Sequence, residues 1–135
     1  MTLNALLAVV ILTSAPAPHT VVERLFEAFN RHDTAALQAL YAPGARLTSS
    51  DFCHPRTAAD VPRTYTGIFR AFPNIHDRIT AGVFDGDQAA VRFISTGTGA
   101  MGRLHQEFIT YFRFRNGRII EDDTVFDTKG RACDP

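Results

Sequence analysis

The chain has 135 residues, and its 14 basic side chains balance 14 acidic ones to give a formal net charge of zero at pH 7. This length predicts one domain, and a chain of this size buries enough apolar surface to fold without a metal or a disulfide. The balanced charge argues against a nucleic-acid partner, which requires a strongly basic face. No apolar run is long enough to hold the processed chain in a membrane.

The first 19 residues differ in composition from the rest of the chain. Residues 3–17 are apolar or small, and Pro16 and Pro18 break the run. An apolar stretch of this length is typical of a secretory signal peptide, and Ala15-Pro16-Ala17 resembles a cleavage site, although the first four residues carry no Lys or Arg. We therefore expect export to the periplasm or the medium. The alternative is a cytoplasmic protein whose apolar N-terminal arm packs on the domain or on a partner.

Cys53 and Cys133 are the only cysteines, and their number excludes a zinc site or a thioredoxin-like motif. Export would allow one disulfide, and closing so long a loop stabilises by roughly 4 kcal/mol in the chain-entropy model. We nevertheless expect two unpaired thiols, because Cys133 is the third residue from the end.

Three helices are expected in the first half of the chain. Thr20 and Glu23 form a capping-box pattern that opens the first helix, and apolar residues follow at helical spacing. Asp33 is a suitable N-cap for a second helix, which Pro43-Gly44 stops. The third helix is expected to be capped by Asp60, with Pro62 in its first turn and Pro73 at its end.

The remainder of the chain has the pattern of strands. Asp85-Gly86 and Asn116-Gly117 are hairpin signals. They divide the sequence into strands over 75–84, 88–96, 103–115 and 118–127, and residues 45–48 form a further short strand. Helices followed by an antiparallel meander predict an α+β fold, with helices packed on one face of a curved sheet.

Strict alternation along the strands predicts which side chains face the helices. Phe108, Thr110, Phe112 and Phe114 share the helix-facing side of the long strand. Val91, Phe93 and Ser95 share a side of the preceding strand. On the last strand, alternation places Glu121, Asp123, Val125 and Asp127 on one face, unless a bulge intervenes.

Five segments in this order resemble the nuclear transport factor 2-like superfamily, in particular its SnoaL-like proteins. The first is the run from Glu23 to Asp33, ERLFEAFNRHD, which resembles the family's opening helix. The others span residues 37–45, 69–74, 86–93 and 112–121. The resemblance implies a cystatin-like α+β roll: a curved antiparallel sheet wrapped around three helices, enclosing one apolar pocket and often dimeric. It places the domain at 20–130, before a tail at 131–135.

Ketosteroid isomerases of this superfamily use a helix-one tyrosine, a carboxylate base in the first strand and a buried acid on the long strand. The matching positions here hold Leu25, Ser49 and Thr110. We therefore exclude that activity, unless Asp51 serves as the base.

The SnoaL-like pattern places an acid/base aspartate at the end of the last strand, where this sequence has Asp127. A carboxyl at the mouth of an apolar pocket has a raised pKa, which suits acid–base catalysis; the alternative is that Asp127 is a solvated residue. Asp51, His54 and Tyr65 are the candidate assisting groups. The expected ligand-binding residues are Phe26, Phe29, Phe52, Phe69, Phe93, Ser95, Thr110, Phe112 and Asp123.

These residues predict a domain that binds one small apolar or aromatic molecule and catalyses proton transfer, cyclisation or hydration without a cofactor. The five histidines have no metal-ligand spacing, so no metal is expected. The alternative is a non-catalytic ligand-binding or dimerisation module whose phenylalanines fill the cone. A homodimer is expected through the outer face of the sheet, where Ile94, Ile109 and Tyr111 lie beside Arg92 and Arg113.

Overall fold

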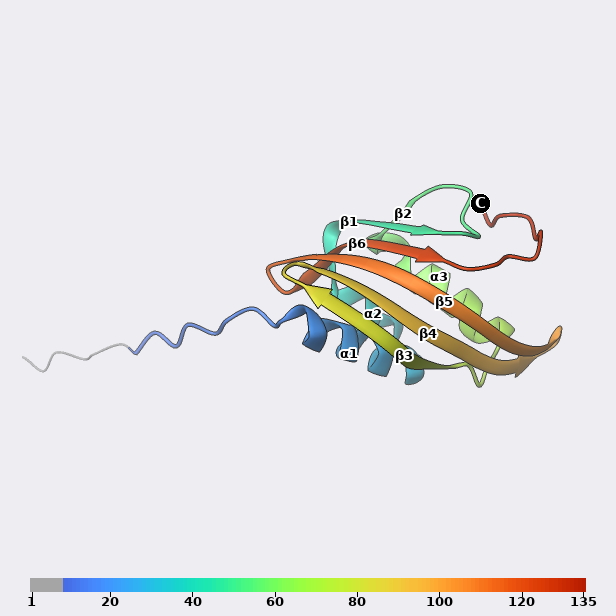
Figure 1. Cartoon of the computed structure of the whole chain (residues 1–135), viewed down its shortest axis with the longest axis horizontal. Coiled ribbons are helices and arrows are strands. Elements are labelled where there is room, and N and C mark those ends of the chain that lie inside the picture. The colour runs from blue at the N-terminus through green and yellow to red at the C-terminus, as the bar shows by residue number, and fades with distance from the viewer. Residues whose placement is uncertain (1–8) are drawn as a thin grey trace, which may run out of the picture.

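The computed structural model describes residues 9–135 (Figure 1). None of the helices in this part of the chain has the length and apolar character needed to cross a membrane. The elements, in chain order, are α1 (Pro18–Asn30), α2 (Thr34–Ala39), β1 (Tyr41–Ser49), β2 (Arg56–Thr57), the 3₁₀ turn η1 (Ala58–Asp60), α3 (Val61–Ala71), β3 (His76–Asp85), β4 (Gln88–Gly99), β5 (Gly102–Arg115) and β6 (Arg118–Val125).

One curved, open sheet carries the helices on a single face, behind the strands in Figure 1. Its strand order is β2-β1-β6-β5-β4-β3. The hairpins β3–β4, β4–β5 and β5–β6 are antiparallel, as is β1–β2, whereas β1 pairs with β6 in parallel. The predicted α+β class is confirmed. The sheet is mixed at that one pair, because the chain passes from β2 through α3 to β3 at the opposite edge and then returns by hairpins until β6 lies beside β1.

The apolar faces of the helices and the inner face of the sheet form one core. The side chains of Val21, Leu37, Phe112 and Ile119 are almost fully buried there. Phe112 and Phe114 face the helices as alternation along the long strand predicts. The packed core therefore holds the helices in place against the inner face of the sheet.

The helix starts only partly follow the sequence signals. α1 begins at Pro18 rather than Thr20, because proline lacks an N–H and suits the first helical turn. Glu23 consequently lies 3.6 Å from His19 instead of closing a capping box. Asp33 does cap α2, since its Oδ1 accepts a hydrogen bond from the backbone N–H of Ala36 at 2.9 Å.

The other two helix boundaries differ from the prediction. Strand β1 starts at Tyr41, directly after α2, because the N–H of Ile119 donates to the carbonyl of Leu40 and draws the chain into the sheet. Asp60 precedes α3 but makes no side-chain cap for it. Its carboxylate instead accepts the backbone N–H of Thr57 at 2.9 Å and stabilises the preceding 3₁₀ turn.

Two β-bulges change which side chains face the helices. Between Ile79 and Ala81 the β3–β4 register shifts by one residue, leaving Thr80 without a partner. The β5–β6 register also shifts, leaving Ile120 without a partner. An extra residue reverses the inside–outside alternation of every residue beyond it.

The bulge in β6 turns Asp123, an expected ligand-binding residue, away from the interior, so that prediction is wrong. Asp122, Thr124 and Phe126 line the interior, whereas Asp123 accepts a hydrogen bond from Thr48 Oγ1 at 2.8 Å outside it. Asp77 lies three residues before the bulge in β3, opposite Ser95, and shares the helix-facing side with the buried Ile75. Two carboxyl groups therefore face the interior, and for Asp122 the bulge in β6 is the cause.

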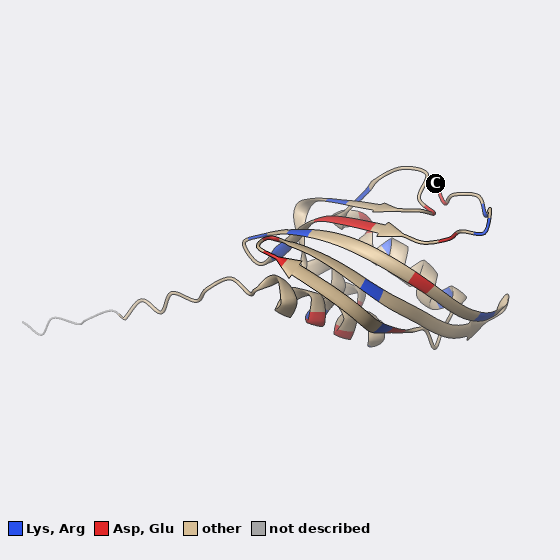
Figure 2. Cartoon of the chain, viewed as in Figure 1, with Lys and Arg blue, Asp and Glu red and all other residues tan. Residues whose placement is uncertain are grey.

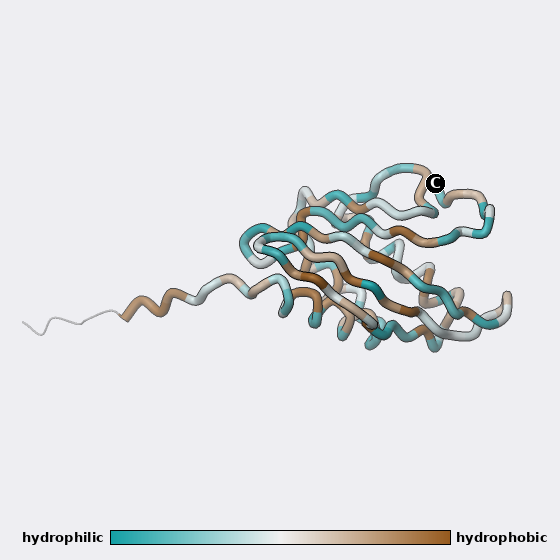
Figure 3. The backbone as a smooth tube through the Cα atoms, in the orientation of Figure 1, coloured by the Kyte–Doolittle hydropathy of each residue, from teal (hydrophilic) through white to brown (hydrophobic). Residues whose placement is uncertain are grey.

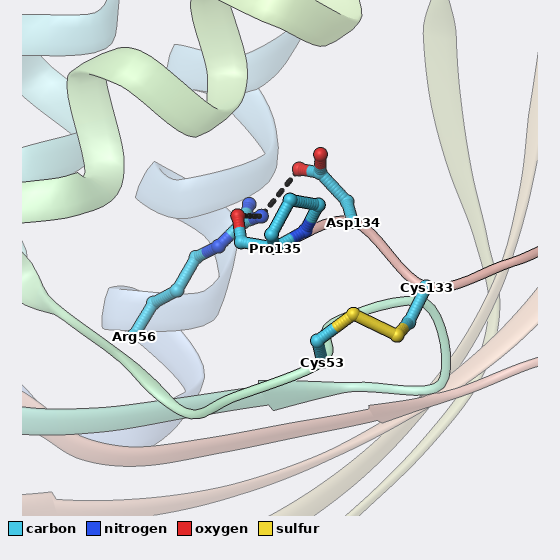
Figure 4. The surroundings of a disulfide bond; sticks show 5 residues. All are labelled: Cys53, Arg56, Cys133, Asp134 and Pro135. Atoms are coloured by element: carbon cyan, nitrogen blue, oxygen red, sulfur yellow. Dashed lines mark hydrogen bonds and ion pairs between the residues drawn. A yellow bond between two sulfur atoms is a disulfide. The ribbon is translucent and has the colours of Figure 1, made fainter.

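The prediction of two unpaired thiols is wrong, because Cys53 and Cys133 form a disulfide (Figure 4). The loop after β1 and the C-terminal segment lie side by side: the N–H of Cys53 donates to the carbonyl of Asp134 at 2.9 Å, and the N–H of Asp134 donates to the carbonyl of Asp51 at 2.6 Å. Residues 131–135 are therefore tied to the domain and are not a free tail.

Reducing this disulfide is expected to lower the free energy of unfolding by about 4 kcal/mol, because the bond closes a long loop of the unfolded chain. Urea unfolding with and without a reductant measures the change. The double variant Cys53→Ser/Cys133→Ser should match the reduced protein. A free energy of unfolding that is the same in both redox states would contradict the expectation.

The N-terminal segment leaves the domain as an extended chain, with Val9 to Leu12 each more than three-quarters exposed. Figure 3 shows this stretch as the apolar start of the coloured tube. Residues 1–8, the first eight of the nineteen residues of the expected signal peptide or arm, lie outside the described residues. Export stays a prediction, and mass spectrometry of the protein from its native host tests it: cleavage predicts a shortened chain.

The outer face of the sheet mixes apolar and charged residues. Ile109 is 52% exposed there, and Arg92 pairs with Glu107 at 3.4 Å. Figure 2 shows basic and acidic positions on this face rather than a patch of one sign. We expect this face to bury against its own copy in a two-fold dimer, and sedimentation velocity at micromolar concentration tests it. A monomer throughout would contradict the expectation.

Candidate active site

A cavity of about 230 Å³ lies between the helices and the inner face of the sheet. Aromatic rings make much of its wall. Phe93 stacks on Phe108 with the ring planes 8° apart, Phe108 contacts Phe126, and Phe26 meets Phe93 edge-on, all with ring centroids 4.6–5.0 Å apart. A flat apolar wall of this kind suits an aromatic or polycyclic molecule.

Asp122 is the central polar group of one wall. Its side chain is only 6% exposed. Oδ2 accepts a hydrogen bond from Tyr41 Oη at 2.7 Å, and Oδ1 accepts one from Thr124 Oγ1 at 3.2 Å. Burial raises the pKa of Asp122 to about 6, because the two hydroxyl donors offset only part of the desolvation and the neighbouring Asp123 adds repulsion.

Tyr65 on α3 extends this cluster toward the opposite wall. Its hydroxyl lies 3.5 Å from the hydroxyl of Tyr41. Burial raises the pKa of Tyr65 far above its usual value, and the charges of Asp122 and Asp77 raise it further. Tyr65 therefore keeps its proton at neutral pH and is a neutral hydrogen-bond donor.

Asp77 faces the cavity from β3. Its side chain is 7% exposed and accepts a hydrogen bond from Ser95 Oγ. The Asn30 side chain holds the backbone here, donating to the Asp77 carbonyl at 2.9 Å and accepting from its N–H at 2.8 Å. Burial raises the pKa of Asp77 to about 7, and the Ser95 hydrogen bond only partly opposes this.

Two carboxyl groups in one apolar cavity thus titrate close to neutral pH. A group with its pKa near the working pH can both accept and donate a proton, which is what general acid–base catalysis requires. Strongly shifted carboxyl groups at a cavity wall also mark candidate functional sites. The site suits the transfer of a proton between carbon and oxygen atoms of a bound molecule.

The cavity gathers nine of the thirteen predicted site residues. These are Asp51, Tyr65, Phe26, Phe29, Phe52, Phe93, Ser95, Thr110 and Phe112. The other four lie elsewhere. Phe69 stacks on His32 with centroids 4.1 Å apart, His54 is exposed, and Asp123 faces away because of the β6 bulge.

Asp127, the predicted acid/base, is exposed and does not line the cavity. Its carboxylate accepts a hydrogen bond from the N–H of Lys129 at 2.8 Å in a turn beyond β6. The strand ends at Val125, so the chain leaves the sheet before Asp127.

The residues missed from the sequence are Asp122, Asp77 and Tyr41. The acidic triplet at 121–123 is visible in the sequence, but only the bulge decides which of its members faces inward. Among residues 9–135, no three His, Cys, Asp or Glu side chains gather as a metal site would require.

The sequence profile of the SnoaL-like domain matches residues 22–122, and the chain belongs to this family. No curated protein matches the sequence.

Solved structures share the fold. IdmH from Streptomyces antibioticus, to which polyketide cyclase activity is ascribed, is 26% identical with a TM-score of 0.74, over 83% of this chain and 93% of that one. A protein of ketosteroid isomerase-like fold from Catenulispora acidiphila, crystallised with trimethylamine, is 17% identical with a TM-score of 0.75, over 84% and 88%. A SnoaL-like protein from Jannaschia is 17% identical with a TM-score of 0.71, over 85% and 92%.

Proposed function

We propose that the protein is a cofactor-independent enzyme that binds a small aromatic ketone in the cavity and moves a proton at the carbon next to the carbonyl group. The observation that carries this proposal is the buried Asp122 carboxyl, held by two hydroxyl donors against an aromatic wall. The polyketide cyclase activity ascribed to IdmH, which has the same fold, agrees with such chemistry.

The proposed step starts with Asp122 as a carboxylate. It takes the proton from the carbon beside the carbonyl, the C–H bond breaks, and its electron pair moves onto the carbonyl oxygen. Tyr65 or a protonated Asp77 donates a hydrogen bond to that oxygen and stabilises the charge, as neutral donors in an apolar site do. The enolate carbon then takes the proton back from Asp122. Alternatively, it forms a C–C bond to a second carbonyl of the same molecule, the π electron pair of that carbonyl moves onto its oxygen, and the resulting alkoxide takes the proton from Asp122.

Deuterium exchange at the α-carbon of small ketones that carry an aromatic ring, with 2-tetralone as the first, tests this proposal in D₂O by proton NMR. We expect the protein to exchange these protons faster than buffer alone. Phe108→Trp should block the cavity and slow exchange. Ile109→Trp, on the opposite face of the same strand, is the matched control and should not.

Binding of the ketones without any exchange above buffer would contradict the enzyme. It would favour the non-catalytic ligand-binding module.

A further inference from the structure

The C-terminal strap, residues 126–135, runs beside the loop after β1 and contributes two side chains to the cavity wall, Phe126 and Arg131. The Cys53–Cys133 disulfide fixes the strap to that loop (Figure 4). A short parallel bridge between Phe52 and Asp134 adds a second attachment. The strap is therefore a built part of the site.

Arg56 anchors the end of the strap, and its guanidinium is occupied by contacts within the protein. Its guanidinium is 6% exposed, pairs with the Asp134 carboxylate and lies 3.8 Å above the ring of Phe52. It also donates to Thr64 Oγ1 at 3.0 Å. Its charge is therefore neutralised within the protein.

Arg131 is placed differently. Among the residues that the structure describes, it is the only basic one lining the cavity, where Asp51, Asp77 and Asp122 are the acidic ones. Its Nε donates to the carbonyl of Thr128 at 3.1 Å, which orients the guanidinium plane. Within residues 9–135 it forms no ion pair, and its two terminal nitrogens make no hydrogen bond.

An oriented guanidinium with both terminal nitrogens available suits bidentate binding of a carboxylate. Asp77 and Asp122 lie on the buried wall, so a negative charge on the ligand is repelled from the inside of the cavity when they are ionised. The Asp51 carboxylate accepts the Ser49 hydroxyl at 2.5 Å and does not pair with Arg131. An acidic ligand is thereby oriented with its carboxylate outward and its rings inward.

We propose that Arg131, on the disulfide-held strap, binds a carboxylate of the ligand, so that the preferred ligands are aromatic acids rather than neutral aromatic molecules. This inference rests on the proposed function only in taking the cavity as the ligand site.

The test compares 2-naphthoate with 2-naphthamide, which has the same rings without the charge. We expect the protein to bind the acid about tenfold more tightly than the amide at neutral pH. Arg131→Gln should bring the two dissociation constants together and leave that of the amide unchanged. Arg118→Gln removes another exposed arginine, at the β5–β6 turn and outside the cavity, and should keep the full preference.

Equal binding of acid and amide by the unaltered protein, or an acid preference that survives in Arg131→Gln, would overturn the inference. Binding of the amide distinguishes failure of this inference from failure of the proposed function, because the amide does not need Arg131. If Phe108→Trp abolishes amide binding, the cavity is the ligand site whatever Arg131 does. If neither compound binds in a way that Phe108→Trp affects, both proposals fail.

Discussion

Asp122→Asn is expected to slow the exchange of α-protons by about 10²–10⁴-fold, the range that general acid–base catalysis contributes. The amide has the shape of the carboxyl group and still accepts the hydrogen bond from Tyr41, so fold and ligand affinity should change little. It cannot take up the proton at neutral pH. Exchange rates and dissociation constants of 2-tetralone for the two proteins measure the effect.

Asp127→Asn is the matched control. The family pattern favours Asp127 as the acid/base, but its carboxylate is exposed beyond the end of β6. The substitution should therefore leave the exchange rate unchanged. Tyr41→Phe removes one donor to Asp122 and should give an intermediate rate. Full activity in Asp122→Asn would remove Asp122 from the mechanism. Loss of activity in Asp127→Asn would show that Asp127 is the acid/base, as the family pattern predicts.

Asp77→Asn is expected to be more stabilising at neutral pH than at acid pH. The difference in the free energy of unfolding between the variant and the unaltered protein should grow by as much as about 4 kcal/mol between the two conditions. Burial raises the pKa of Asp77 from 3.8 to about 7 in the folded state. Between these values the folded protein holds a proton that the unfolded chain has released. Stability therefore falls as pH rises through this window, and it levels off above the folded pKa.

The asparagine variant has no such titration. Its free energy of unfolding in urea, minus that of the unaltered protein, should increase from about pH 4 to pH 7 and then stay constant. Asp127→Asn should show no increase of this kind. A difference for Asp77→Asn that does not change with pH would show that this carboxyl titrates alike in both states.

The sequence predicts the fold well where one local signal decides the outcome. The hairpin turns at Asp85-Gly86 and Asn116-Gly117 set the pairing of the long strands. Each tight turn brings the strand before it and the strand after it together as an antiparallel pair, β3 with β4 and β5 with β6. The helix-facing phenylalanines of β5 follow from simple alternation. These features need no knowledge of contacts distant in the sequence.

The chemical groups of the site depend on what alternation cannot show. A bulge is a response of one strand to the curvature of the whole sheet, and one extra residue at Thr80 or Ile120 exchanges the inner and outer faces. Asp122 enters the cavity for that reason, whereas Asp77 follows the alternation that starts at the buried Ile75. The sequence does not predict the disulfide either. Its two cysteines are 80 residues apart, and only the folded chain brings the strap beside the loop after β1.

The cavity is expected to hold two carboxyl groups that titrate near neutral pH. Carbon-13 NMR of aspartate side-chain carboxyls, titrated from about pH 3 to about pH 9, measures this directly. We predict two resonances with midpoints of about 6 and about 7, the first missing from Asp122→Asn and the second from Asp77→Asn. If both carboxyls titrated near their ordinary value of about 4, the cavity would hold no group poised to exchange a proton at neutral pH.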